Sequence, residues 1–496
     1  SSGMAMAHWE IQGWMILILG WVFVPFYTRS MVYTMPEFLE RRYNPQSRTI
    51  LSVISLVSYV LTKVAVTVYA GGLVFQQVFG IKELWGIDFF WIAAIGLVVL
   101  TALYTIFGGM KSVLYTSVLQ TPILLLGSLI ILVLGFKELG GWDEMMRVCG
   151  AVTVNDYGDT MTNLIRSNDD ANFPWLGALI GSAIIGFWYW CTDQFIVQRV
   201  LSGKNEMEAR RGTIFGAYLK LLPVFLFLIP GMIAFALHQK YIGAGGEGFL
   251  PMLENGTANA DAAFPTLVAK LLPAGVKGLV VCGILAALMS SLASLFNSSA
   301  MLFTIDFYKR FRPQTSEKKL VGIGQVATVV IVILGILWIP IMRSVGDVLY
   351  TYLQDVQSVL APGIAAAFLL GICWKRTSAQ GGMWGLISGM VIGLTRLGAK
   401  VYYSNAGEVA DSTFKYLFYD MNWLFFCGWM FLFCIIVVIV VSLATEAPTA
   451  EKIQGLVFGT ATKEQKASTR ASWNHWDIIH TVIILAITGA FYWYFW

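Results

Sequence analysis

The chain has 496 residues, of which 57% are hydrophobic and only 12% charged, and its formal net charge is +4. A soluble domain has about a quarter charged residues with which to cover its surface. The composition therefore excludes a soluble or disordered protein and indicates a multi-span membrane protein. The small net charge does not indicate a basic surface for nucleic acid, and we expect no nucleic-acid partner.

The sequence lacks the usual signatures of catalysis. The six cysteines form no CxxC pair, and the four histidines show no zinc-ligand spacing. Neither a Walker A loop nor a GxSxG elbow is present. We therefore expect neither an enzyme nor a protein with a bound cofactor.

Apolar runs define the predicted fold. A helix needs about 20 mostly apolar residues to cross a bilayer. Reading along the chain for such runs predicts an all-α protein with about twelve spans, at residues 11–28, 50–79, 85–107, 116–135, 175–200, 212–237, 270–304, 320–343, 350–374, 380–400, 421–443 and 477–495.

Lysine and arginine in the loops predict the orientation, because cytoplasmic loops carry an excess of both. One set of loops holds 20 of the 33 basic residues, and these loops lie near 29–49, 108–116, 196–211, 305–319, 375–378 and 444–476. We expect this side to face the cytoplasm. Both ends of the chain then face outside.

Polar residues interrupt the span at 175–200, in the segment WYWCTDQFIVQR. Three aromatic residues are followed there by Thr192, Asp193 and Gln194. A broken helix beside a cavity would need such residues, because freed backbone groups and polar side chains can then meet water or solute. Rings next to amide and carboxylate groups also suit a sugar. The alternative is an ordinary helix end at the cytoplasmic interface.

Three further charged side chains fall in or near spans. Lys220 is surrounded by apolar residues and requires a carboxylate or solute oxygens, unless it reaches the nearby interface. Glu10 lies near the outer end of the first span, either as a partner for a solute hydroxyl or as an interfacial acid. For Lys63 we expect only an ion pair with an acidic residue or a side chain that extends to the membrane interface.

Hydroxyl and amide side chains mark two other spans. Ser290, Ser294 and Ser298 share one helix face, with Ser291 beside them. Their oxygens suit a weakly held sodium ion, although small residues at this spacing also pack membrane helices together. Gln354 and Gln357 lie one turn apart and could bind a solute or bridge two helices.

The segments WYWCTDQFIVQR, YLKLLPVFLFLIPGM and LMSSLASLFNSSAMLFTIDFYKR, in this order, strongly resemble the sodium/glucose cotransporters of the sodium:solute symporter family. YTMPEFLERRY, ALYTIFGGMKSVLYT and YLQDVQSVLAPGIAAAFLLGICWKR extend the resemblance. It runs from residue 1 to about residue 376. The last spans are similar mainly in hydropathy.

The resemblance implies a leucine-transporter-like fold with two inverted five-helix repeats, and alternating access in which sodium entry drives sugar uptake. It implies a transporter core at 1–376, holding core helices 2–10, and three peripheral spans at 377–496. It also implies a plasma membrane location. The first broken helix of the family would precede residue 1, so we expect an N-terminally truncated chain.

The resemblance also assigns site residues. The expected sugar ligands are Glu10, Lys220, Gln354, Trp190, Tyr189 and Gln357. The expected gates are Tyr189 on the inner side and Trp9 and Tyr350 on the outer side. The expected sodium ligands are Ala287, Ser290 and Ser291, with Ser294 and Ser117 as weaker candidates for a second sodium site.

Three positions depart from the family pattern; the first concerns sodium, and the other two leave the solute open. Ser117 stands where many relatives have Asp, which favours a single coupled sodium. Gly186 stands where relatives carry Asn or Thr, and Gln357 where Thr is common. Glucose, galactose, another hexose or a cyclic polyol fits this pattern. The alternatives are a family symporter for a different small solute, and a sugar sensor that passes sodium current without transport.

Overall fold

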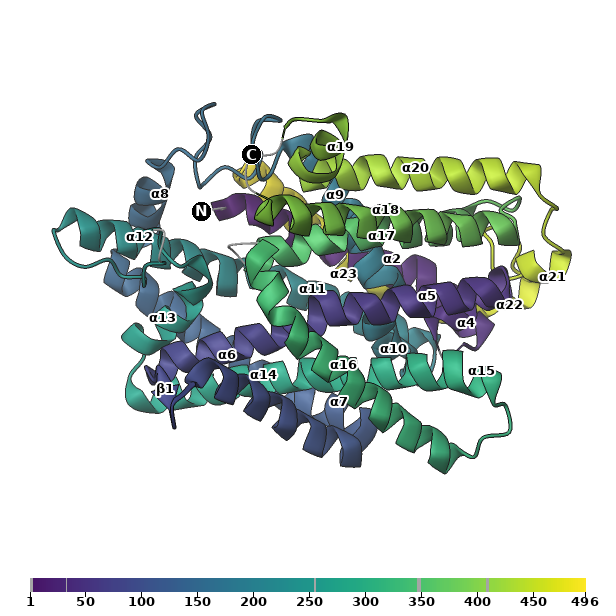
Figure 1. Cartoon of the computed structure of the whole chain (residues 1–496). Helices are drawn as coiled ribbons and strands as arrows, with labels where there is room; N and C mark the ends of the chain where they lie inside the picture. Colours follow the sequence, from purple (N-terminus) through teal and green to yellow (C-terminus); the bar gives the residue numbers. More distant parts are fainter. Residues whose placement is uncertain (1–2, 33, 254–255, 346–348, 407–409) are drawn as a thin grey trace.

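The computed structural model describes residues 3–32, 34–253, 256–345, 349–406 and 410–496. Figure 1 shows an almost entirely helical molecule in which the long helices run in one common direction. Ten helical stretches in the described residues are long and apolar enough to cross a membrane. The shorter Phe89–Leu103 and the helix Ala379–Asn405 complete the twelve predicted ranges. The prediction of an all-α multi-span protein is therefore confirmed.

The spans are assembled from consecutive helical elements. In chain order these are η1 (Gly3–Met6), α1 (Ala7–Glu10), α2 (Gly13–Ile18), η2 (Leu19–Phe23) and α3 (Val24–Ser30); α5 (Pro45–Ser58), η3 (Tyr59–Val64) and α6 (Ala65–Phe79); α7 (Phe89–Leu139); α9 (Trp175–Gly186) and η4 (Phe187–Thr192); α11 (Glu206–Pro223), η5 (Val224–Leu228) and α12 (Ile229–Gly243); α14 (Ala274–Met301), η7 (Leu302–Tyr308) and α15 (Lys309–Phe311); α16 (Glu317–Val345); α17 (Leu349–Cys373); α18 (Ala379–Asn405); α20 (Trp423–Ala444); and α23 (His475–Tyr494).

Short elements connect them. These are α4 (Met35–Arg42), the antiparallel strands β1 (Glu83–Leu84) and β2 (Ile87–Asp88), α8 (Trp142–Gly150), α10 (Gln194–Leu201), η6 (Ala260–Ala262), α13 (Ala263–Leu271), α19 (Thr413–Lys415), η8 (Tyr416–Asp420), α21 (Ala450–Ile453) and α22 (Lys463–Ala471).

Wide π-helical turns lie inside five of the spans, at η2, η3, η4, η5 and η7. Such turns are rare and gather at functional sites, because they leave backbone groups without their usual partners. Two of them, η3 and η4, border the candidate site described below.

Helix α7 accounts for two of the predicted spans. Its first half begins beside α6, where Phe90 lies against Gly72. Its second half lies along α14, where Ser117 meets Ser290 and Gly127 faces Val280. Residue numbers therefore rise along α7 while they fall along α14, and Figure 1 shows the chain running out from β1 and returning toward α8. The chain passes twice across the molecule within this one helix.

The loops that carry most of the basic residues meet on one side. Arg42 donates to the carbonyls of Gly371 at 2.7 Å and Thr377 at 3.1 Å, where it caps the carboxyl end of α17. Arg48 contacts the buried carboxylate of Asp306 at 2.6 Å. Further contacts on this side join Arg310 to Pro45, Lys452 to Glu40 and Arg210 to Ser472.

Segment 151–174 covers the opposite side. The amide of Met4 donates to the carbonyl of Met161 at 2.8 Å, and that of Leu164 to the carbonyl of Phe495 at 3.2 Å. His8 contacts the carbonyl of Leu164 at 3.1 Å. This segment therefore joins the first and last spans.

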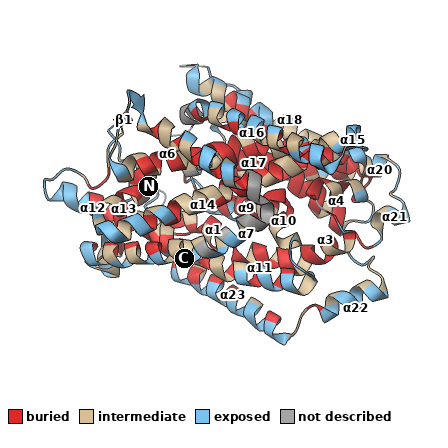
Figure 2. Ribbon diagram, turned by 90° about the horizontal axis from the view of Figure 1, so that it is seen from below, coloured by how far each residue is buried: buried red, intermediate tan, exposed pale blue. Residues whose placement is uncertain are grey.

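The burial pattern distinguishes central from peripheral spans, as Figure 2 shows. In α17, 83% of the apolar window is buried, against 33% in α20 and 22% in α23. Helix α17 therefore lies in the middle of the protein, and α20 and α23 present large apolar faces outward.

Candidate functional site

The span 175–200 is interrupted, as the broken-helix interpretation of its sequence requires. Helix α9 continues into the π-helical turn η4, and the backbone is then extended at Asp193, with φ −80° and ψ 127°. Helix α10 starts at the next residue, and the Asp193 carboxylate accepts a hydrogen bond from the amide of Phe195 at 3.1 Å. A carboxylate at this position accepts a hydrogen bond from an otherwise unpaired amide, and its negative charge is attracted to the positive end of the helix dipole.

Glu10, Lys220 and Trp190 meet at the end of α1. The Lys220 ammonium lies 2.7 Å from the Glu10 carboxylate and 5.6 Å from the centre of the Trp190 ring. The two charged side chains are 16% and 23% exposed, so the pair is shielded but reachable. Lys220 of α11 is therefore paired with Glu10 of another span. Beyond Glu10, the helix is interrupted at Ile11 and Gln12.

Gln12, in this interruption, is a polar residue that the sequence did not single out. Its amide donates to the carbonyl of Ser182 at 2.9 Å, and it is 3% exposed. A Cβ at Gly186 would lie 2.6 Å from the Gln12 amide oxygen. The absence of a side chain at Gly186 thus makes room for Gln12.

Helix α17 carries the two predicted glutamines and packs against α9 and η4. Gln354 and Gln357 are both buried. The amide oxygen of Gln354 has no hydrogen-bond partner among the residues that the structure describes. A buried acceptor left in this state is costly, so it suits a ligand that donates to it. The side chain of Tyr350 lies outside the described residues.

The other predicted gate residues lie in aromatic clusters. The centre of the Trp9 ring lies 5.4 Å from the ring centres of Phe173 and Trp423. Tyr189 packs edge-on against Trp190 at 5.0 Å. Both residues belong to one hydrophobic cluster, with Trp9 buried in it and Tyr189 packed against it.

The serines of α14 form two different contacts. The hydroxyls of Ser117 and Ser290 are 2.5 Å apart, so the structure brings together two residues predicted for different sodium sites. The hydroxyl of Ser294 accepts a hydrogen bond from the guanidinium of Arg199. Ala287 and Ser291 are half-buried nearby on the same helix.

Lys63 was predicted only to pair or to reach the interface, and the structure gives it a partner on another span. It forms a buried ion pair with Asp193, whose other oxygen accepts a hydrogen bond from the Tyr59 hydroxyl at 2.8 Å. The ammonium also lies 5.0 Å from the ring of Tyr189 and 4.4 Å from that of Phe195. Lys63 is the one basic residue of 50–79, and Asp193 is the one acid of 175–200. These opposite charges are the sequence feature that could have indicated their pairing.

Comparison with known proteins identifies relatives. The sodium:solute symporter family matches residues 1–389. The human sodium/myo-inositol cotransporter 2 is 35% identical over 473 residues, which cover 93% of this chain and 69% of the relative. A sodium/mannose cotransporter of Bos taurus is 36% identical over 510 residues, which cover 97% of this chain and 83% of that protein. The sodium/glucose cotransporter 4 of Danio rerio is 34% identical over 491 residues, with 95% and 73% covered.

Solved structures include one with the same fold. A Na⁺-coupled sialic acid symporter in a substrate-bound outward-open state superposes with a TM-score of 0.67 at 21% identity, covering 89% of this chain and 84% of that one. The resemblance drawn from the sequence is confirmed by these matches, and the chain is a transporter rather than an enzyme. By family match and by identity to its relatives, the chain belongs to the sodium:solute symporter family.

Proposed function

We propose that the protein carries a hexose or a cyclic polyol across the membrane together with sodium, by alternating access. The observation that supports this most is the shielded Glu10–Lys220 pair beside Trp190. A carboxylate and an ammonium offer acceptors and donors for hydroxyl groups, and the indole face suits the C–H face of a ring. Relatives named for myo-inositol, mannose and glucose agree with such a solute.

In this proposal, Lys220 donates to solute oxygens while Glu10 accepts from hydroxyls. Gln354 contributes the buried amide oxygen that is free to accept another hydroxyl. Gln357, one turn further along α17, provides a second amide. Each contact replaces a hydrogen bond to water, so specificity comes from the geometry of several such contacts together.

The aromatic residues would control access. Tyr189 closes the inner side beneath the solute, and Trp9 closes the outer side together with Tyr350. Lys63 acts as a positioning residue for Tyr189, because the Lys63–Asp193 pair joins η3 to the broken helix immediately after this tyrosine.

Sodium would bind at α14, through oxygens of Ala287, Ser290 and Ser291. Ser117 adds a hydroxyl beside Ser290. The guanidinium of Arg199 on Ser294 opposes a second cation there, so Ser294 could join only after Arg199 moved. One coupled sodium then stabilises the solute-binding state, and by linkage the solute raises sodium affinity by the same factor.

We place the protein in the plasma membrane with the basic loops in the cytoplasm and segment 151–174 outside, so that both ends of this chain face outside. Residues 1–376 form the transporter core, and 377–496 add three peripheral spans. The contacts that join the basic loops on one side support this topology.

The test is uptake of labelled glucose, mannose and myo-inositol into proteoliposomes that carry the full protein, under an inward sodium gradient or with potassium instead. We expect sodium-dependent accumulation of at least one of them. Ser291→Ala should abolish the sodium response, because it removes a proposed sodium ligand.

Equal uptake in sodium and potassium would contradict sodium coupling. Sugar-evoked sodium current without labelled-sugar uptake would instead identify a sensor. Accumulation of an unrelated solute, with none of the three sugars transported, would leave the family membership intact and overturn the proposed substrate class. An unchanged sodium response in Ser291→Ala would remove that residue from the sodium site.

A further inference from the structure

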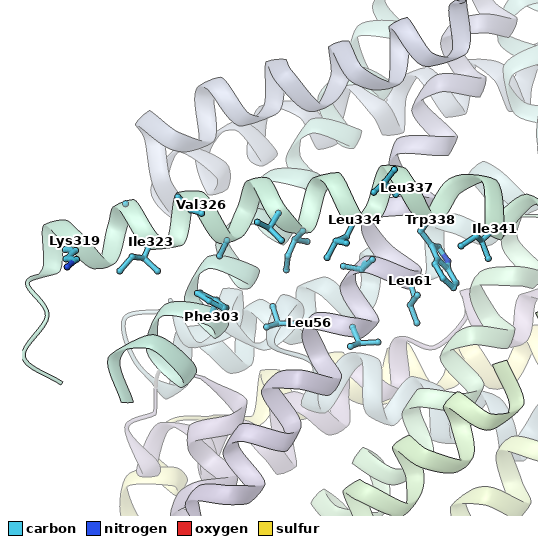
Figure 3. A pocket seen from close by; sticks show the side chains of 16 residues that line it. Leu56, Leu61, Phe303, Lys319, Ile323, Val326, Leu334, Leu337, Trp338 and Ile341 are labelled. Carbon is cyan, nitrogen blue, oxygen red and sulfur yellow. The ribbon is translucent and has the colours of Figure 1, made fainter. Parts of the chain in front are cut away.

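A long groove lies between α16 and the α5–η3 stretch, away from the candidate site. It encloses about 820 Å³. Figure 3 shows α16 along one side, with Leu56 and Leu61 facing it and Phe303 near one end. The groove therefore has two walls from different spans, and Phe303 comes from a third.

The walls of the groove are hydrocarbon. The α16 wall repeats at helical spacing through Val326, Val330, Leu334 and Leu337, all of which are exposed in the folded chain. Val326 and Leu337 are each 64% exposed, which in a membrane-spanning helix means contact with lipid rather than with water. The surrounding bilayer thus provides acyl chains as the occupant.

The groove is longer than one leaflet, so a lipid anchored at one end fills only the part nearest that end. From Lys319 to Trp338 the helix rises by about 28 Å at 1.5 Å per residue, close to the hydrocarbon thickness of about 30 Å. At the far end, the Trp338 indole donates to the Tyr352 hydroxyl at 2.6 Å, and that hydroxyl lies 3.1 Å from the Leu61 carbonyl. These polar groups are already hydrogen-bonded to one another, so a headgroup gains little there.

The other end of the groove carries positive charge. Lys319 is exposed and lines the groove, and the remaining lining residues that the structure describes are uncharged. Residues 309–319 contain five basic side chains and a single acid, Glu317. A lipid whose chain enters here therefore places its phosphate beside Lys319, and an added negative charge on the headgroup strengthens the contact.

We propose that this groove binds an anionic phospholipid, with an acyl chain between α16 and α5 and the headgroup on Lys319. The lipid would lie in the same leaflet as the basic loops. The inference depends on the chain spanning a membrane and not on which solute it carries.

The chain offers matched variants for the test. Lys319→Gln removes the charge that lines the groove, and Lys318→Gln removes an adjacent exposed charge that does not line it. Gly322→Leu fills the groove near Lys319, where a Cβ meets nothing within 4 Å. Gly278→Leu is its control, since it also meets nothing and lies outside the groove.

The measurement is native mass spectrometry of the full, delipidated protein, titrated with palmitoyl-oleoyl phosphatidylglycerol or with the phosphatidylcholine that has the same chains. We expect the protein to retain a bound phosphatidylglycerol and to bind phosphatidylcholine more weakly. Lys319→Gln should weaken phosphatidylglycerol binding about fivefold, the effect of one basic residue near a membrane surface. Gly322→Leu should weaken both lipids, whereas the two control variants should bind as the unmodified protein does.

Equal retention of the two lipids, or equal effects of Lys318→Gln and Lys319→Gln, would show a general lipid shell and overturn the proposal. Unchanged binding in Gly322→Leu would place the lipid elsewhere. A dimer that persists without lipid and is disrupted by Gly322→Leu would show that a second copy of the chain occupies the groove, and would also overturn it.

Discussion

Single residues determine the character of the candidate site, and Gln12 is the clearest case. Its amide takes the space that a side chain at Gly186 would fill, with the Cβ only 2.6 Å from its oxygen. The departure at Gly186 is thus compensated by a residue from another span. A larger residue at Gly186 would have to displace Gln12 from the Ser182 carbonyl.

We predict that Gln354→Ala raises the half-saturating sugar concentration by about 5- to 150-fold, which corresponds to about 1–3 kcal/mol for a lost buried hydrogen bond. The reason is the amide oxygen of Gln354, which is buried and has no hydrogen-bond partner among the described residues. Labelled-sugar uptake at saturating sodium measures the effect. As a control, Gln76→Ala removes an amide that is hydrogen-bonded to Asp88 near the end of α6, and it should leave the half-saturating sugar concentration unchanged. Unaltered sugar kinetics in Gln354→Ala would exclude a contact.

At the scale of elements, one buried ion pair joins two π-helical turns. Lys63 belongs to η3, and Asp193 lies between η4 and α10. Tyr59 adds a hydrogen bond to the same carboxylate at 2.8 Å. Because Tyr189 lies in η4 and touches the Lys63 ammonium, movement of this tyrosine changes the surroundings of the pair.

We predict that Lys63→Met lowers the thermal stability of the purified protein strongly, because it leaves Asp193 buried without its counter-charge, at a cost of about 3–5 kcal/mol. Asp193→Asn should lower the thermal stability in the same way, because it leaves Lys63 buried without its counter-charge. The double variant should be more stable than either single variant, since no unpaired charge remains. Thermal unfolding in nanodiscs measures this double-mutant cycle, and simple additivity of the two effects would argue against a direct pair.

Some of these elements could be predicted from sequence and others could not. The break at Asp193 could be inferred only as one of two alternatives, because aromatic residues followed by Thr192, Asp193 and Gln194 suit either a broken helix or a helix end at the interface. The interruption at Ile11 and Gln12 was not, since the run at 11–28 reads as one apolar helix. The Lys63–Asp193 pair depends on the packing of two distant spans, and sequence supplied only the two isolated charges.

At the scale of the whole molecule, the charge distribution and the contacts agree. Five of the six loops predicted to share one side are joined by contacts such as Arg42 with Gly371, while most side chains of the sixth, at 108–116, lie outside the described residues. Segment 151–174 joins the first and last spans on the other side. Loop composition could predict this grouping because lysine and arginine are sorted by side. Apolar runs also predicted the two passes at 85–107 and 116–135, but they could not predict that helical structure continues through the expected loop at 108–116.

We predict that a membrane-impermeant maleimide labels Tyr157→Cys in intact cells and labels Lys466→Cys only after permeabilisation. Both positions are exposed, the first in segment 151–174 and the second on α22. The background should carry serine at Cys282 and Cys373, the exposed native cysteines. Labelling in the reverse order would show that the basic loops face outside.

The close approach of α17 and α18 has a mechanical consequence. A Cβ at Gly389 would lie 2.6 Å from the Cα of Gly363, so α17 and α18 meet backbone to backbone, and Asp355 and Lys400 tie them again. Two helices this close cannot slide past one another without separating. We therefore expect these two helices to move together, with bending left to the places where the helical hydrogen bonds are already broken, beside Gln12 and at Asp193.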